Sequence, residues 1–214
     1  DLVEGHGSVG SRSLFVGGNA ILRGIEDFLE ECKQLAASEL EASVEDLEYH
    51  QGNFQVKGTR VGIGIFDLCS RQSGNSISVK RKKELTGRSW PNGCHVAEVE
   101  IDAETGEVRL DRYVSVDDVG NTVNPMIVHG QVQGGIASGL GQAVLERTEY
   151  DASGQLLSGS YMDYALPRAD DMPSLSGSLF EKAPCLTNPL GAKGTGEIGA
   201  VAGPPAIVHA VIDA

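Results

Sequence analysis

The chain has 214 residues and a formal net charge of −13 at pH 7, with 40% hydrophobic and 22% charged residues. This length supports one large domain or two small ones, and the composition is that of a folded protein rather than a disordered one. The acidic excess disfavours nucleic-acid binding and attachment to an anionic membrane, because both need a broad basic surface. The one basic run, Lys80 to Lys83, is therefore interpreted as a solvated strand edge or turn.

The first half of the chain predicts one long helix and a small hairpin. Apolar residues recur at helical spacing from Ala20 to Leu40, and charged residues occupy the opposite face. Three short elements are expected after it: a helical turn with a capping-box pattern at Ser43 to Asp46, a hairpin of Leu47–Tyr49 with Phe54–Val56, and a short helix over Val61–Cys69.

The second half predicts a longer hairpin and further helices. His95–Asp102 and Val108–Val116 alternate in polarity across a turn, which is the pattern of two paired strands. The remaining expected elements are a helix over Pro125–Glu146, a hairpin of Thr148–Tyr150 with Gln155–Leu157, a strand over Leu175–Phe180, and a C-terminal helix with Pro205 in its first turn. We therefore expect an α+β fold with mixed sheets and packed helices, spanning residues 1–214; two α+β subdomains with a boundary near 90–125 are the alternative.

The helix expected after Pro125 is rich in glycine. Each glycine in a helix interior is unfavourable by roughly 0.8 to 1.0 kcal/mol relative to alanine, so the close approach of another backbone or a buried ligand must offset this cost. The sequence leaves both explanations open for Gly130, Gly134, Gly135, Gly139 and Gly141. A membrane dimerisation helix is excluded because Gln131, Gln133 and other polar residues interrupt the segment.

The cysteines and histidines show no metal-site spacing. Cys32, Cys69, Cys94 and Cys185 lie far apart, and the five histidines, interpreted mostly as structural, are equally scattered. Reduced thiols in a cytoplasmic protein are therefore expected. We find no signal peptide and no apolar run long enough to cross a bilayer. Because the chain begins at Asp1 and stops inside an expected helix, we expect it to be a piece of a larger protein.

Two N-terminal segments suggest an anionic ligand. Gly5 to Gly10 matches the letters of a dinucleotide-binding fingerprint, but a hydrophobic strand does not precede it as that motif requires. Ser11-Arg-Ser13 follows, with Gly17-Gly18 at the entrance of the first helix. Hydroxyls, backbone N–H groups and an arginine at a helix start suit a phosphate or pyrophosphate. A capped helix with a flexible leader explains the same residues equally well.

Glu197 stands alone in the glycine-rich stretch Gly191 to Pro205, where Lys193 is the only other charge. Glycines allow a backbone to approach a ligand closely, so the segment is interpreted as a ligand-facing loop with one acid–base group. The alternative is a solvated carboxylate that the dipole of a following helix favours.

Several of these segments occur in a diagnostic order: Gly10-Ser-Arg-Ser13, Trp90 to Asp102, Val116-Asp-Asp-Val-Gly120, Asn124-Pro125, Gly130-Gln-Val-Gln-Gly-Gly135 and Lys193-Gly-Thr-Gly-Glu197. This series resembles the C-terminal part of the molybdenum-binding large subunit of the xanthine dehydrogenase, aldehyde oxidase and carbon monoxide dehydrogenase family. The resemblance extends from Ser8 to the last residue and is weakest between Ala42 and Arg88.

The resemblance implies the second molybdopterin-binding half of such a subunit, in which the pterin holds molybdenum and no protein side chain need ligate the metal. It implies the cytosine dinucleotide form of the cofactor. Glu197 would be the catalytic general base, and the implied cofactor-binding residues are Gly10, Ser11, Arg12, Ser13, Gln131, Lys193, Gly194 and Gly196.

The parent enzyme implied by this resemblance oxidises an aldehyde, an N-heterocycle or carbon monoxide, with water as the oxygen source. Its partners would be the remainder of the large subunit and the iron–sulfur and FAD domains or subunits, so the fragment is not expected to turn over alone. Two alternatives of other classes remain: a cofactor-free scaffold or interaction module, and a nucleotide-binding module that uses Gly5 to Gly10.

Overall fold

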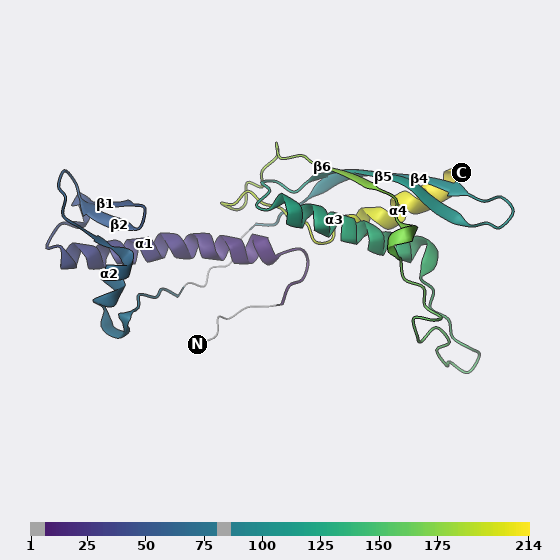
Figure 1. The fold of residues 1–214 in the computed structure, drawn as a ribbon, viewed down its shortest axis with the longest axis horizontal. Coiled ribbons are helices and arrows are strands. Elements are labelled where there is room, and N and C mark those ends of the chain that lie inside the picture. The colour runs from purple at the N-terminus through teal and green to yellow at the C-terminus, as the bar shows by residue number, and fades with distance from the viewer. Residues whose placement is uncertain (1–6, 81–86) are drawn as a thin grey trace. The chain divides into compact units, whose positions relative to one another are not determined.

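The computed structural model describes residues 7–80 and 87–214 of the chain (Figure 1). These residues form two compact units, one within 17–84 and one that combines the N-terminal residues up to 16 with residues from 85 onward. Gly5 and His6 of the fingerprint-like segment, and residues 81–83 of the basic run, lie outside the described residues.

The unit within residues 17–84 consists of a helix, a three-stranded antiparallel sheet and a second, short helix. Helix α1 (Asn19–Glu39) precedes β1 (Leu47–His50), β2 (Asn53–Val56), β3 (Gly62–Gly64) and α2 (Ile65–Ser70). Between β1 and β2, Gln51 and Gly52 have φ values of 46° and 85°, and two successive left-handed residues are the hallmark of a tight two-residue hairpin turn. The predicted long helix and hairpin are confirmed.

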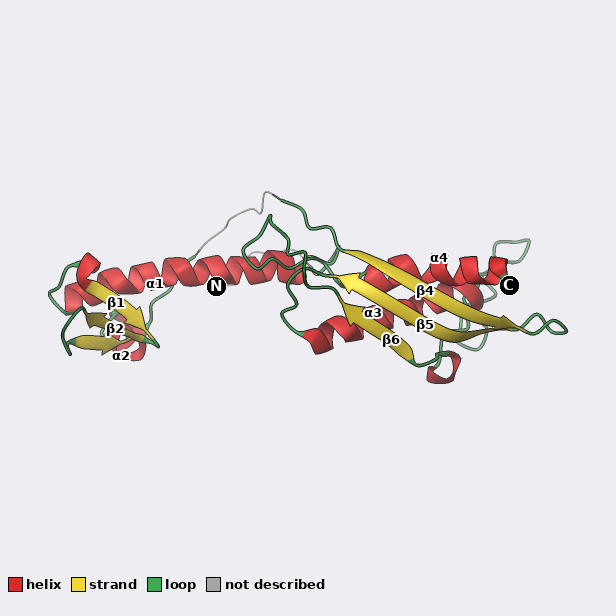
Figure 2. Cartoon of the chain, turned by 90° about the horizontal axis from the view of Figure 1, so that it is seen from above, coloured by secondary structure: helices red, strands yellow, loops and turns green. Residues whose placement is uncertain are grey.

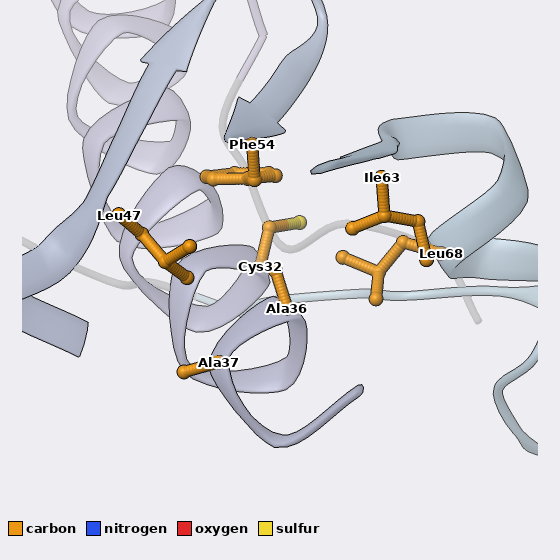
Figure 3. Close-up of a cluster of buried hydrophobic side chains, with 7 residues drawn as sticks. All are labelled: Cys32, Ala36, Ala37, Leu47, Phe54, Ile63 and Leu68. Atoms are coloured by element: carbon orange, nitrogen blue, oxygen red, sulfur yellow. The ribbon is translucent and has the colours of Figure 1, made fainter. Parts of the chain in front are cut away.

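The core of this unit forms between one face of α1 and the inner face of its sheet. Figure 3 shows Cys32 and Ala36 of α1 beneath Phe54 of β2, with Leu68 of α2 beside them. Two details of the prediction are wrong. The residues 61–69 begin as strand β3 because Gly62 pairs with Gln55 of β2, and the turn over Val44–Asp46 lacks the capping box because the Ser43 hydroxyl bonds the Glu45 carboxylate instead.

The second unit is a three-stranded mixed sheet with two helices on one face (Figure 2). Strands β4 (Asn92–Ile101) and β5 (Val108–Asp118) pair antiparallel, and β6 (Leu175–Leu179) lies parallel to β5. Helices α3 (Pro125–Leu140) and α4 (Ile198–Asp213) pack on each other and on this sheet. The core between helices and sheet contains Leu110, Tyr113, Val132, Ile136, Leu140 and Ile207.

Close packing of α3 on α4 explains several of the helix glycines. A Cβ atom on Gly135 would lie 2.7 Å from the Ala200 backbone nitrogen, and one on Gly199 would lie 2.3 Å from the Val132 carbonyl oxygen. A Cβ atom on Gly139 would lie 3.1 Å from the Gly203 Cα. Of the two explanations left open by the sequence, backbone approach therefore accounts for Gly135 and Gly139.

The structure corrects the limits of three predicted elements. Helix α3 stops at Leu140, and a π-helical turn over Gly141–Leu145 replaces its expected last residues. The hairpin expected at 148–157 is reduced to one isolated bridge, Tyr150 to Leu156. Helix α4 begins at Ile198, so Pro204 and Pro205 lie inside it rather than in its first turn; this earlier start brings Gly199 against α3.

The two compact units divide the chain between residues 84 and 85, and the expected subdomain boundary near residues 90–125 stays a prediction. That range contains β4 and β5, which pair from Asn92 and Asp118 at one end to Ile101 and Val108 at the other. A domain boundary between residues 92 and 118 would separate or cut these two hydrogen-bonded strands.

Candidate functional site

Residues from the two ends of the second unit meet at Ser11 and Glu197. The Ser11 Oγ donates a hydrogen bond of 3.0 Å to Glu197 Oε2, although 186 positions separate the two residues in the chain. The loop that precedes Glu197 also touches the N-terminal segment, because a Cβ atom on Gly194 would lie 2.8 Å from Ser11 Cβ and 3.0 Å from its carbonyl oxygen. Only glycine fits at position 194 without displacing Ser11.

Helix α3 contributes Gln131 to the same place. A Cβ atom on Gly196 would lie 3.4 Å from Gln131 Oε1 and 3.5 Å from Ser11 Oγ. The amide, the hydroxyl and the neighbouring Glu197 carboxylate therefore surround Gly196. Five of the residues singled out from the sequence, Ser11, Gln131, Gly194, Gly196 and Glu197, lie together.

The N-terminal side of the site depends on an uncommon backbone conformation. Gly10 and Ser11 have successive φ values of 59° and 55°, and the Arg12 N–H donates to the Val9 carbonyl oxygen at 3.3 Å. The left-handed region is unfavourable for a serine, so such a residue persists only where its surroundings hold it in place. The glycine loop against Ser11 is one such restraint.

The C-terminal side is fixed to the end of β5 through Lys193. Its backbone N–H donates to the Val119 carbonyl oxygen at 2.7 Å, and its Nζ pairs with Asp118 Oδ2 at 2.6 Å. Only 10% of the Lys193 side chain and 13% of the Asp118 side chain are exposed. The ammonium group of Lys193 is thus occupied by a carboxylate, and the residue anchors the loop that carries Glu197.

Arg12 and Ser13 lie beside this meeting point on the same N-terminal segment. The side chain of Arg12 is exposed and passes Gly10, whose added Cβ atom would lie 3.5 Å from Arg12 Cδ. The Ser13 hydroxyl forms a hydrogen bond with the Ser8 hydroxyl. Their expected contacts with a cofactor stay predictions.

A buried polar cluster under α3 and α4 is not among the predicted sites. His95 bonds the Tyr113 hydroxyl through Nδ1 and Asp117 Oδ1 through Nε2, each at 2.9 Å, and its side chain is 3% exposed. Burial, and then the charge of Asp117, raise the pKa of Tyr113 to about 12. Alternation along β4 puts His95 on the same face as Ala97 and Val99, which is the signal that could have revealed the cluster. Its interpretation as a structural histidine agrees with this burial.

Among residues 7–80 and 87–214, no three or more histidine, cysteine or acidic side chains gather as a metal site would require. The polar groups around Gly196 are instead the Ser11 hydroxyl, the Gln131 amide and the Glu197 carboxylate. A sequence model of the molybdopterin cofactor-binding domain matches residues 1–173. The chain belongs to the molybdopterin cofactor-binding domain family.

Curated relatives share about a third of their residues with this member of the family. It is 33% identical over 222 residues to the 6-hydroxypseudooxynicotine dehydrogenase complex subunit gamma of Paenarthrobacter nicotinovorans, covering 99% of this chain and 28% of that protein. It is 32% identical over 218 residues to the carbon monoxide dehydrogenase large chain of Hydrogenophaga pseudoflava, covering 98% of this chain and 27% of that protein. The chain thus spans little more than a quarter of these relatives.

Two solved structures have the same fold. The Cu,Mo-CO dehydrogenase in its carbon monoxide reduced state matches with a TM-score of 0.84 and 30% identity, over 99% of this chain and 28% of that one. Quinoline 2-oxidoreductase from Pseudomonas putida 86 matches with a TM-score of 0.81 and 35% identity, over 97% and 28%. The predicted α+β fold and the resemblance to a large-subunit segment of molybdenum-dependent oxidoreductases are confirmed. Within the described residues, no helix combines the length and apolarity needed to span a membrane.

Proposed function

We propose that this chain is the part of a molybdenum hydroxylase large subunit that binds molybdopterin as its cytosine dinucleotide and supplies Glu197 as the active-site base. The observation that carries the proposal is the meeting of Ser11, Gln131 and Glu197 around Gly196. Relatives named as carbon monoxide dehydrogenase, nicotine 6-hydroxylase and quinoline 2-oxidoreductase support carbon monoxide or an N-heterocycle as substrate. An aldehyde is the third substrate class that the family resemblance implies.

The residues present fit a bulky polar cofactor. Gly130 and Gly134, the α3 glycines on either side of Gln131, have no neighbour within 4 Å of an added Cβ atom, so a ligand could lie close to this stretch of helix. The Gln131 amide and the exposed backbone groups suit pterin and phosphate atoms, which need hydrogen-bond donors and acceptors rather than a cluster of metal ligands. When bound, the cofactor would supply the two-electron redox centre of the reaction.

Two features of Glu197 support its proposed role in proton transfer. It is exposed and stands immediately before Ile198, the first residue of the 16-residue helix α4. The positive end of the helix dipole favours a negative charge there. A carboxylate so placed can accept a proton from the water that provides the oxygen atom, if it comes within hydrogen-bond reach of that water. Gln131 would orient the cofactor, and the Lys193–Asp118 pair would keep the loop in position.

The proposed partners follow from the part of the relatives that this chain covers. One relative is named as a subunit of a dehydrogenase complex, and this chain covers 28% of it. We therefore propose that the rest of the large subunit completes the substrate pocket and that iron–sulfur and FAD domains or subunits accept the electrons. The proposed location of this assembly is the cytoplasm.

Replacement of Glu197 by glutamine in the intact enzyme tests the proposal. Glutamine keeps the shape of the side chain but cannot act as a base, so turnover should fall by at least about 100-fold. Molybdenum and pterin contents should stay at the level of the unmodified enzyme. Glu104→Gln, in the exposed turn between β4 and β5, is the matched control and should keep full turnover.

The other outcomes are equally informative. Full turnover in the Glu197→Gln enzyme would end the base assignment. Loss of molybdenum together with turnover would assign Glu197 to cofactor retention. Absence of both molybdenum and pterin from the unmodified enzyme would favour a cofactor-free scaffold.

A further inference from the structure

Ser11 makes a contact that its expected role as a phosphate ligand does not explain. We propose that Ser11 is a positioning residue that fixes the Glu197 carboxylate through Oε2, so that Oε1 remains to receive the proton. This inference rests on the proposed function, in which Glu197 is the base. It changes the role of Ser11 from cofactor binding to the alignment of another side chain.

The hydrogen-bond capacity of the hydroxyl supports this assignment. A serine side chain has a single O–H donor, and a phosphate oxygen at neutral pH needs a donor. The Ser11 proton is directed at Glu197 Oε2 at 3.0 Å. While this bond exists, Ser11 cannot also donate to a phosphate, so the two roles exclude each other in one conformation.

The backbone around Ser11 holds its side chain in this direction. Gly10 and Ser11 are both left-handed, a conformation that a serine does not adopt without restraint. Gly194 lies so close that an added Cβ atom would be 2.8 Å from Ser11 Cβ. The loop that carries Glu197 therefore packs against the residue that bonds Glu197, and each segment limits the movement of the other.

The hydrogen bond between Ser11 and Glu197 should affect the reaction rate more than the binding of substrate or cofactor. An exposed glutamate side chain samples many rotamers, and a hydrogen bond to one oxygen restricts it to those in which the other oxygen faces the site. A general base acts only from a correct geometry, so a freely rotating carboxylate lowers kcat. Substrate and cofactor contacts made by other residues are unaffected.

The direct test is Ser11→Gly in the intact enzyme. Glycine adopts a φ of 55° without strain, so this substitution removes the hydroxyl while keeping the backbone path. We expect kcat to fall about tenfold, the lower range for a hydrogen bond to a charged group, with KM and molybdenum content unchanged. Gln51→Gly is the matched control, since Gln51 is also left-handed with a φ of 46° but belongs to the β1–β2 turn.

A second measurement does not depend on turnover. In the full 214-residue chain with carbon-13 in its glutamate carboxylates, the signal of Glu197 is assigned by its disappearance in Glu197→Gln. The Ser11→Gly substitution should shift this carboxylate signal, and Gln51→Gly should leave it in place. An unshifted signal would show that the hydrogen bond does not form and would overturn the positioning role.

The outcomes also separate this inference from the proposed function. Loss of molybdopterin in Ser11→Gly would identify Ser11 as a cofactor ligand and overturn the positioning role. Lost turnover in Glu197→Gln combined with an unchanged kcat in Ser11→Gly would reject the positioning role alone. Full turnover in Glu197→Gln would show that Glu197 is not the base, and would reject both the proposed function of Glu197 and the positioning role of Ser11.

Discussion

Helix α3 carries glycines in two different settings. At Gly135 and Gly139, added Cβ atoms would lie 2.7 to 3.1 Å from atoms of α4, closer than side-chain carbons normally approach. At Gly130 and Gly134, an added Cβ atom would meet nothing within 4 Å, and Gln131 of the candidate site lies between them. One residue type in one helix therefore serves tight packing at some positions and leaves open space at others.

This difference shows why a count of glycines could not explain the helix. Each glycine carries a similar conformational cost wherever it lies in the helix interior. Contact with α4 offsets that cost at Gly135 and Gly139, because the two backbones can then approach closely. At Gly130 and Gly134 the described residues provide no such contact, so either a ligand or the proposed remainder of the large subunit is left to offset the cost there.

The largest effect is expected where α4 meets α3. Gly199→Ala would place a Cβ atom 2.3 Å from the Val132 carbonyl oxygen and 2.7 Å from the Ile136 nitrogen. Because both are backbone atoms, the helices must separate, and we expect a loss of about 3 kcal/mol in the free energy of unfolding. Urea unfolding measures this loss, and hydrogen exchange of the α3 amides in the native state gives a second measure of it.

Gly203→Ala is the control for this substitution. Its Cβ atom would lie 3.4 Å from Gly139 Cα, an ordinary contact distance. We expect a smaller loss, of about 1 kcal/mol, because the better helix propensity of alanine offsets part of the crowding between its Cβ atom and the following Pro204. Equal destabilisation by the two substitutions would contradict the close contact at Gly199.

An intermediate effect is expected from Tyr113, in the core that α3 covers. Its folded-state pKa of about 12 lies above the ordinary value of 10 for tyrosine. The neutral hydroxyl therefore contributes stability that is fully present below pH 10 and is lost as the pH rises through 12. Two pKa units correspond to at most about 3 kcal/mol, of which about 2 kcal/mol is lost by pH 12. The second unit should therefore unfold at a lower urea concentration at pH 12 than at pH 9.

Tyr113→Phe should remove this dependence between pH 9 and pH 12. The variant is expected to be about 1 kcal/mol less stable at pH 9, because the hydrogen bond to His95 is lost. Tyr161→Phe is the control, since Tyr161 is 83% exposed. If Tyr113→Phe kept the alkaline loss of the unmodified chain, another group would be responsible for it.

Periodicity predicted the elements that bury a regular apolar face. Helix α1 and the β4–β5 hairpin begin and end within a few residues of their expected limits. The expected hairpin at 148–157 is shortened to the Tyr150–Leu156 bridge, beside which the Leu157 N–H donates to the Glu149 carbonyl oxygen at 2.8 Å and the pairing ends. The start of α4 was misplaced because Pro205 was interpreted from local preference, whereas tertiary packing against α3 sets the helix limits.

The candidate site was predicted from the order of motifs rather than from periodicity. No local pattern brings Ser11 next to Glu197, since loop closure over the whole second unit places them together. The ion pair of Lys193 with Asp118 was likewise missed, because a lysine in a glycine-rich loop is equally suited to a ligand or to a carboxylate. The sequence identified which residues meet but not which atoms each one contacts.

The smallest effect, and the sharpest test of the two glycine settings, is expected at Gly134. Gly134→Ala meets no atom within 4 Å, so alanine should raise the free energy of unfolding of the chain by up to about 1 kcal/mol. If the cofactor lies beside this part of α3 as proposed, the same methyl group should lower the molybdopterin content of the intact enzyme. Unfolding in urea and pterin analysis measure the two effects separately. A stabilised enzyme with a full complement of cofactor would show that the open space at Gly134 is not part of the binding site, and the cost of that glycine would then have no ligand to offset it.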